Sequence, residues 1–225
     1  MSRLSLAALV VLAGCAPTYA PPVRNTHHGA PGHADRHESE LRLAAGVPAG
    51  VAGGLMLPLG GSTHLELRGE GSDRWVLGTA GLRLTALRER DGKHAEWLAD
   101  VGFGGGVGRG GELCGNEPEV TANCDGDVAV ADGRAWHQRL AGGGYLDAGL
   151  ALAIHDWLVP FVRGALRLST ATGVPMTFWA SGSIGLEARL DPVAVYLLGG
   201  WFGYTNDFGE NDGAFLETGV AVRFN

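Results

Sequence analysis

Lysine, cysteine and helical periodicity are all scarce in this sequence, and each scarcity argues against certain classes of protein. Lys93 is the single lysine among 17 basic residues, whereas soluble domains usually carry many lysines on their surfaces. This speaks against a solvent-exposed domain, although a genome biased towards arginine explains the ratio equally well. The formal net charge of −7 argues against nucleic acid as a partner.

No long segment after Glu38 has the period of an α-helix, whereas segments that alternate apolar and polar residues recur at short spacing. The 38 glycines follow no Gly-X-Y repeat, which excludes a collagen-like chain. They fall within the alternating segments, where a closely packed sheet or barrel interior accommodates them. The sequence therefore predicts an all-β protein.

The clearest alternating segment is 215–224, at the end of the chain. Its aliphatic residues and Phe224 fall on one face, whereas Glu217 and Arg223 fall on the other. From Glu217 to Phe224 the order of polar, glycine, apolar and aromatic positions resembles the C-terminal signal of bacterial outer-membrane β-barrels. Asn225 is a departure from that pattern, in which the aromatic residue is terminal. The resemblance implies an outer-membrane barrel that is inserted by the barrel-assembly machinery.

Residues 1–14 read as an export signal, because one basic residue (Arg3) precedes an apolar run that is too short to span a bilayer as a stable helix. The sequence LAGC at 12–15 resembles the lipobox of bacterial lipoproteins. That resemblance implies cleavage before Cys15 and acylation of its sulfur and amine. With Ala16 in the next position, it also implies delivery to the outer membrane by the lipoprotein-sorting machinery. An ordinary export signal with an incidental cysteine is the alternative.

Three cysteines leave an odd one in an oxidising compartment. If Cys15 is acylated, Cys114 and Cys124 remain as a pair that encloses nine residues. We expect a disulfide between them, which would stabilise its loop by about 2–3 kcal/mol.

Residues 15–37 are rich in Pro, Ala, Gly and His and have no apolar period, so we expect a flexible tether. Half of the eight histidines lie in this segment: His27, His28, His33 and His37. Clustered imidazoles can bind Zn²⁺ or Cu²⁺, but a disordered spacer without fixed geometry is the favoured interpretation. We expect neither a metal site nor a cofactor.

Charged residues within the predicted strands lie on the face opposite the aliphatic side chains. From Trp75 onward, six basic and five acidic residues follow this rule, which would allow them to pair inside a barrel: Arg83, Glu96, Asp100, Arg139, Asp147, Arg163, Arg167, Glu187, Arg189, Glu217 and Arg223. A soluble barrel or sandwich would expose this charged face to water, whereas a transmembrane barrel would enclose it.

Four features favour the transmembrane barrel. The strands are long enough for a tilted crossing of the bilayer, and the charged face is otherwise composed of small residues. Short turns at 155–156 and 191–192 alternate with longer polar loops at 110–134 and 205–213. Aromatic residues lie on the aliphatic face near strand ends, as interfacial girdles require: Trp97, Trp136, Phe178, Trp201 and Phe224.

The pattern over residues 38–225 resembles the small OmpA-type barrels and predicts an antiparallel up-and-down β-barrel of transmembrane type with eight to ten strands. Eight or ten strands are compatible with both chain ends on the periplasmic side, whereas nine are not. This segment would follow the signal peptide (1–14) and the tether (15–37).

The function that we expect is that of an outer-membrane lipoprotein with a structural or surface-interaction role and no catalytic activity. No catalytic arrangement of nucleophile and base is evident in the sequence. A soluble periplasmic barrel that binds an apolar ligand is the first alternative, and a small outer-membrane enzyme acting on lipid or peptide is the second. The acidic group Asn123, Asp125 and Asp127 lacks the spacing of a calcium loop, so we interpret it as a solvated loop.

Overall fold

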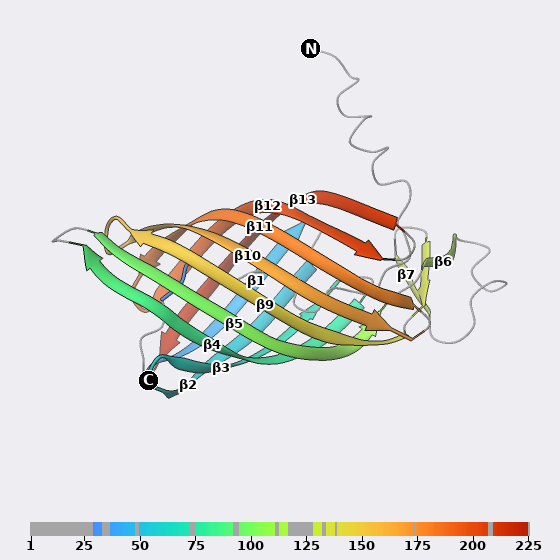
Figure 1. The fold of residues 1–225 in the computed structure, drawn as a ribbon, viewed down its shortest axis with the longest axis horizontal. Helices are drawn as coiled ribbons and strands as arrows, with labels where there is room; N and C mark the ends of the chain where they lie inside the picture. The colour runs from blue at the N-terminus through green and yellow to red at the C-terminus, as the bar shows by residue number, and fades with distance from the viewer. Residues whose placement is uncertain are drawn as a thin grey trace, which may run out of the picture.

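A computed structural model of the chain contains a closed antiparallel β-barrel of ten strands (Figure 1). The structure describes residues 29–32, 37–47, 50–72, 75–91, 95–110, 113–116, 128–131, 134–137, 139–172, 174–206 and 209–224. The barrel strands are β1 (Ser39–Val47), β2 (Gly50–Gly60), β3 (Thr63–Gly71), β4 (Trp75–Asp91), β5 (Ala95–Gly110), β9 (Arg139–Ala153), β10 (Leu158–Ala171), β11 (Val174–Leu190), β12 (Val193–Asn206) and β13 (Gly209–Phe224). None of the described segments is a helix with the length and hydropathy needed to cross a membrane.

The barrel closes where its first and last strands meet. β1 pairs with β13 from Ser39 opposite Phe224 to Val47 opposite Leu216. Closure leaves no free edge along this seam, so the backbone polar groups of the wall bond to neighbouring strands. The all-β antiparallel architecture is therefore confirmed, with the larger of the two strand counts that the sequence allowed.

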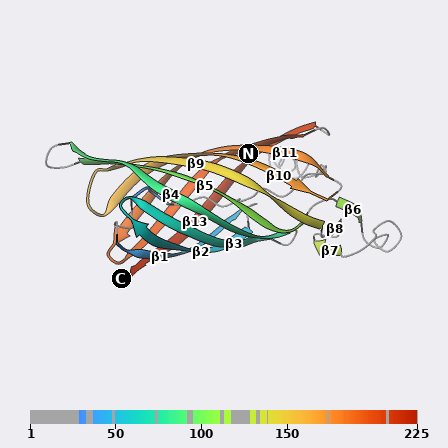
Figure 2. The ribbon, with the colours of Figure 1, turned by 60° about the horizontal axis from the view of Figure 1, so that its bottom comes forward.

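A second, three-stranded sheet stands at one end of the barrel (Figure 2). It contains β6 (Leu113–Asn116), β7 (Val128–Ala131) and β8 (Arg134–His137), in the order β6-β8-β7. These strands lie in a region that was expected to be a loop followed by the start of a barrel strand. Trp136 therefore belongs to the small sheet and not to an aromatic girdle of the barrel.

The second long loop that we expected, at 205–213, is instead largely strand. β12 runs to Asn206 and β13 begins at Gly209, with Asn206 paired to Gly209. Glu210 and Asp212 are exposed, so their charged side chains do not prevent this pairing. Among the connections between the described barrel strands, the long one runs from the end of β5 at Gly110 to the start of β9 at Arg139.

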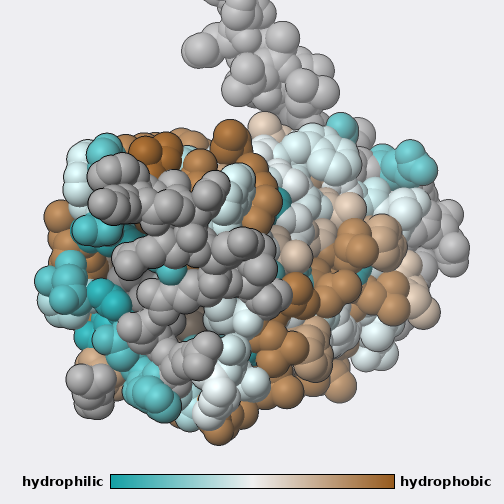
Figure 3. Space-filling model, turned by 60° about the vertical axis from the view of Figure 1, so that its left-hand side comes forward, coloured by the Kyte–Doolittle hydropathy of each residue, from teal (hydrophilic) through white to brown (hydrophobic). Residues whose placement is uncertain are grey.

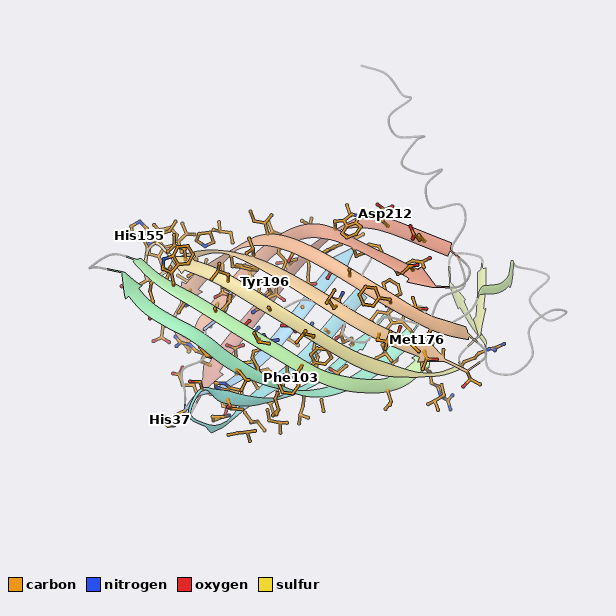
Figure 4. All side chains as sticks on the ribbon, viewed as in Figure 1. His37, Phe103, His155, Met176, Tyr196 and Asp212 are labelled. Carbon is orange, nitrogen blue, oxygen red and sulfur yellow. The ribbon has the colours of Figure 1, made fainter. Side chains whose placement is uncertain are left out.

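The outer surface of the barrel is aliphatic (Figure 3). Leu43, Val107, Leu140, Ile184 and Leu197 are each more than half exposed, and they come from five different strands. Four of the five aromatic residues expected near the rims are also exposed on this surface, namely Trp97, Phe178, Trp201 and Phe224. In Figure 4, Phe103 projects outward from β5, whereas Tyr196 lies within the barrel.

The inner surface carries the charges. Five arginines and seven acidic residues are buried there: Arg42, Arg68, Arg83, Arg163, Arg167, Glu40, Glu66, Glu70, Asp100, Asp147, Glu187 and Glu217. A soluble barrel would have the opposite arrangement, with charges outside and aliphatic side chains inside. The protein is therefore a transmembrane β-barrel of the outer-membrane type, with lipid around its wall.

We predict that Leu166→Arg, near the middle of β10, lowers the free energy of unfolding in lipid by about 2–4 kcal/mol, since it puts a charge into hydrocarbon. Leu190→Arg is the matched control, because it adds the same charge to the outer face at the last residue of β11, where the expected cost is about 0–1 kcal/mol. Urea titration of the two variants in liposomes measures both. Equal losses would argue against a lipid-facing wall.

Candidate functional site

Two arginines and two aspartates form a closed ion-pair cluster inside the barrel. Arg83 lies 3.0 Å from Asp100 and 2.9 Å from Asp147, measured from guanidinium nitrogen to carboxylate oxygen. Arg163 lies 2.8 Å from Asp100 and 3.3 Å from Asp147. Each arginine therefore forms ion pairs with both aspartates. Asp147 accepts hydrogen bonds from both arginines, whereas Asp100 accepts one from Arg163 and is held near Arg83 by charge.

Cross-strand register explains why these four side chains meet. Gly102 on β5 is paired with Arg83 on one side and with Asp147 on the other. Gly149 on β9 is likewise paired with Asp100 and with Arg163. Because each glycine has no side chain, the charged groups on both sides of it can extend over its backbone.

The space above these glycines is filled. A Cβ atom at Gly149 would lie 2.8 Å from Cζ of Arg163, and one at Gly102 would lie 2.9 Å from Cζ of Arg83. Both distances are shorter than a carbon–carbon contact allows. A side chain at either position would therefore displace the guanidinium group that lies over it and disturb its ion pairs.

Further charged pairs continue around the inner wall. Glu66 on β3 accepts from Arg83 at 3.5 Å, and Arg68 lies 3.4 Å from Glu70 on the same strand. On β1, Arg42 is paired with Glu40. Sequence reasoning did not include these charges in the network, because it counted only from Trp75 onward. The alternation of Leu65 and Leu67 with their polar neighbours already contained the necessary signal.

The other residues expected in the network lie at several places in the barrel. Arg167 donates to Ser181 Oγ at 2.9 Å, and Tyr196 donates to Glu217 at 3.0 Å. Glu96 is half-buried at the end of the barrel that carries the short turns.

Two of the expected arginines lie at opposite rims. Arg139 donates to the carbonyl oxygen of Thr172 at 2.8 Å, at the end that carries the small sheet. Arg223 pairs with Glu38 at 3.1 Å and with Asp191 at 2.6 Å, at the short-turn end. These rim contacts are half-exposed and contribute little to stability compared with the buried cluster.

Residues 29–32 lie inside the barrel, although they fall within the stretch that was expected to be a tether. Arg163 Nε donates to the carbonyl oxygen of Gly29 at 2.7 Å, and the Ala30 amide donates to Glu187 Oε2 at 2.7 Å. Arg189 bridges Glu187 Oε1 and the carbonyl oxygen of Pro31, at 2.8 Å each. No periodicity or motif in the sequence indicates that this segment is buried.

An apolar cluster receives Ala30, whose exposed fraction is 0%. The cluster is built from inward-facing residues of five strands: Leu98, Ala151, Val159, Phe161, Tyr196, Leu198 and Phe215. Most of these residues lie in the half of the barrel nearer the short turns, where β10 begins and β11 ends. This half of the interior is therefore filled by charges, apolar side chains and the N-terminal segment together.

Aromatic side chains line the interior nearer the small sheet. The ring centroids of Trp179 and Tyr204 are 4.6 Å apart, and those of Phe202 and Phe215 are 6.4 Å apart. Trp179 Nε1 donates to Ser169 Oγ at 3.1 Å. The two halves of the interior thus differ in chemistry.

Several predictions fall on residues that the structure does not describe. Cys15 and Cys124 lie outside the described residues, so the lipid anchor and the disulfide of Cys114 stay predictions. The acidic group at 123–127 also lies outside them. Within the described part of the chain, no group of three or more His, Cys, Asp or Glu side chains is placed to hold a metal ion.

We predict that Arg83→Met lowers the free energy of unfolding by about 3–5 kcal/mol, because it leaves Asp100 and Asp147 sharing one arginine in a buried site. Arg223→Met is the matched control at the half-exposed rim, with an expected loss of about 1 kcal/mol or less. Urea titration in liposomes compares the two variants. A loss of the same size in both would contradict a stabilising role for the cluster.

Comparison with known proteins identifies no family for this chain. No protein-family model matches the chain, and no curated protein sequence does so. OmpT (in-vitro folded), an outer membrane protein of Vibrio cholerae, aligns with 83% of this chain and 96% of its own, at 10% identity and a TM-score of 0.27. Its loop L8 deletion mutant aligns with 83% and 98%, at 7% identity and a TM-score of 0.29. At these values the alignments define neither a family nor a function for this chain.

Proposed function

We propose that the protein is a small, OmpA-type outer-membrane lipoprotein barrel that has a structural or surface-interaction role and does not act as an enzyme or an open channel. The observation that supports this function best is the buried cluster of Arg83, Arg163, Asp100 and Asp147. These four residues are 3–6% exposed, so they are almost completely shielded from water. An ion path requires charged groups that remain accessible to the permeating ion.

The pairing within the cluster argues for a structural role. Each arginine is neutralised by two aspartates that it contacts directly, and burial makes the loss of any one partner costly. Such a cluster ties together β4, β5, β9 and β10, which are adjacent strands of the wall. An ion path lined by the same residues would have to break these pairs for each passage.

The small sheet provides the surface for interaction. It projects from the end of the barrel opposite the short turns, where external loops of outer-membrane barrels are found. In this proposal the barrel holds residues 111–138 outside the membrane, and the Cys114–Cys124 disulfide restrains them.

The barrel is expected to be non-conducting. Purified full-length protein in planar bilayers should give no discrete current steps, because the buried charged pairs occupy the interior. The Arg83→Met variant tests whether the cluster itself blocks the interior. If it does, this variant should give current steps, after heat-modifiable migration has established that it is folded. Regular current steps from the wild-type protein would refute the closed-barrel function.

The lipoprotein part of the proposal has a separate test. Cys15→Ser should abolish metabolic labelling with a fatty acid and block processing by the lipoprotein signal peptidase, since no acceptor thiol remains at the lipobox. Cys114→Ser is the matched control, because it removes a thiol elsewhere and should keep the label. Labelling that survives Cys15→Ser would show that the protein is not a lipoprotein of this type.

A further inference from the structure

We propose that the short-turn half of the barrel interior is a binding site for a bent peptide of small residues, and that residues 29–31 of the same chain are its exchangeable occupant. The site is formed by Arg163, Glu187 and Arg189, by the apolar cluster around Ala30, and by Gly149. This inference does not depend on the lipid anchor or on the role of the external sheet.

The polar contacts recognise peptide backbone and not side chains. Arg163 and Arg189 donate to the carbonyl oxygens of Gly29 and Pro31, at 2.7 and 2.8 Å. Glu187 accepts from the amide of Ala30 at 2.7 Å. Hydrogen bonds in which one partner is ionised are about twice as strong as neutral ones, so three of them hold three consecutive residues firmly.

The shape of the site selects small residues. A Cβ atom at Gly29 would lie 2.8 Å from Cδ1 of Tyr196, and a second clash would occur with Glu187 Oε2. Ala30 fills its place in the apolar cluster completely, since its exposed fraction is 0%. Pro31 lies in a notch over Gly149, where an added Cβ would come within 2.9 Å of the proline ring. The occupant is therefore matched at each of its three positions.

The site remains electrostatically balanced when it is empty. Glu187 keeps its contact with Arg189 at 2.8 Å, and Arg163 keeps its contacts with Asp100 and Asp147. Release of the peptide thus leaves no charge without a partner of opposite sign. An unpaired buried charge would be the largest cost of emptying such a site, and that cost is avoided. Residues 29–32 belong to no strand, so release breaks no ladder of the barrel wall.

Tethering explains why the cis segment occupies the site. A covalently linked ligand has an effective concentration in the millimolar range when its linker is short, so a free peptide competes poorly with it. A peptide in trans is expected to bind only after the cis segment has been displaced. The site then accepts a peptide of Gly-Ala-Pro character that adopts the same bend.

The test uses the full-length Ala30→Asp variant, which places a carboxylate next to Glu187 and within the apolar cluster while leaving the site itself unchanged. A fluorescent synthetic peptide with the sequence of residues 27–33 (HHGAPGH) is titrated against the variant in nanodiscs, and anisotropy is measured. The variant should bind the peptide at least about tenfold more tightly than the wild-type protein, whose site is occupied. His37→Asp adds the same charge at an exposed position and should bind like the wild type.

Two further measurements make the result decisive. Adding Gly149→Leu to the Ala30→Asp variant fills the volume taken by Pro31 and the Arg163 guanidinium. Once heat-modifiable migration has established that this variant is folded, it should bind the peptide about tenfold or more weakly, whereas adding Gly182→Leu on the outer face of β11 should not change binding. A peptide with aspartate in place of its alanine should also fail to bind. If folded Ala30→Asp protein binds the peptide no better than wild type, or if Gly149→Leu has no effect, residues 29–31 are a fixed part of the interior and the proposal is wrong.

Discussion

The pairing of β1 with β13 is the constraint on which the rest of the structure depends. Hydrocarbon offers no hydrogen-bond partners, so a sheet can cross it only when its first and last strands close on each other. Closure fixes the direction of every side chain, because successive residues of a strand point alternately outward and inward. Aliphatic residues therefore face lipid, and the charged residues on the other face are enclosed in the barrel, where they pair with one another. Closure thus brings the buried Arg–Asp cluster together, and the cluster in turn links four adjacent strands of the wall.

Much of the fold was predictable because a two-residue period shows which residues of a strand share a face and which face is apolar. The alternation around Arg163 and Arg167 on β10, for example, identified both faces of that strand correctly. Strand ends were less predictable, since the acidic residues near Glu210 indicate a loop although the backbone continues as β13. The small sheet was missed because β6, β7 and β8 have only four residues each, which is too short to show a period.

The candidate site was predictable only in part, for a physical reason. Sequence patterns place a charge on a face, but they do not give the register between strands, and register alone brings Asp100 and Arg163 together across Gly149. The burial of Ala30 was not predictable at all. The polar contacts of this segment are made through backbone atoms, which every residue possesses, so the segment resembles an ordinary Pro- and Gly-rich spacer.

Gly149 touches two parts of the protein that lie far apart in the chain, and this has an evolutionary consequence. An unconstrained spacer drifts freely in sequence and length. The segment that precedes β1 has no such freedom, because Pro31 and the guanidinium of Arg163 share the volume that Gly149 leaves empty. Substitutions at these three positions are therefore expected to be epistatic. A homologue with a larger residue in place of the glycine would need a smaller or shifted residue in the N-terminal segment, or a shorter cation on β10.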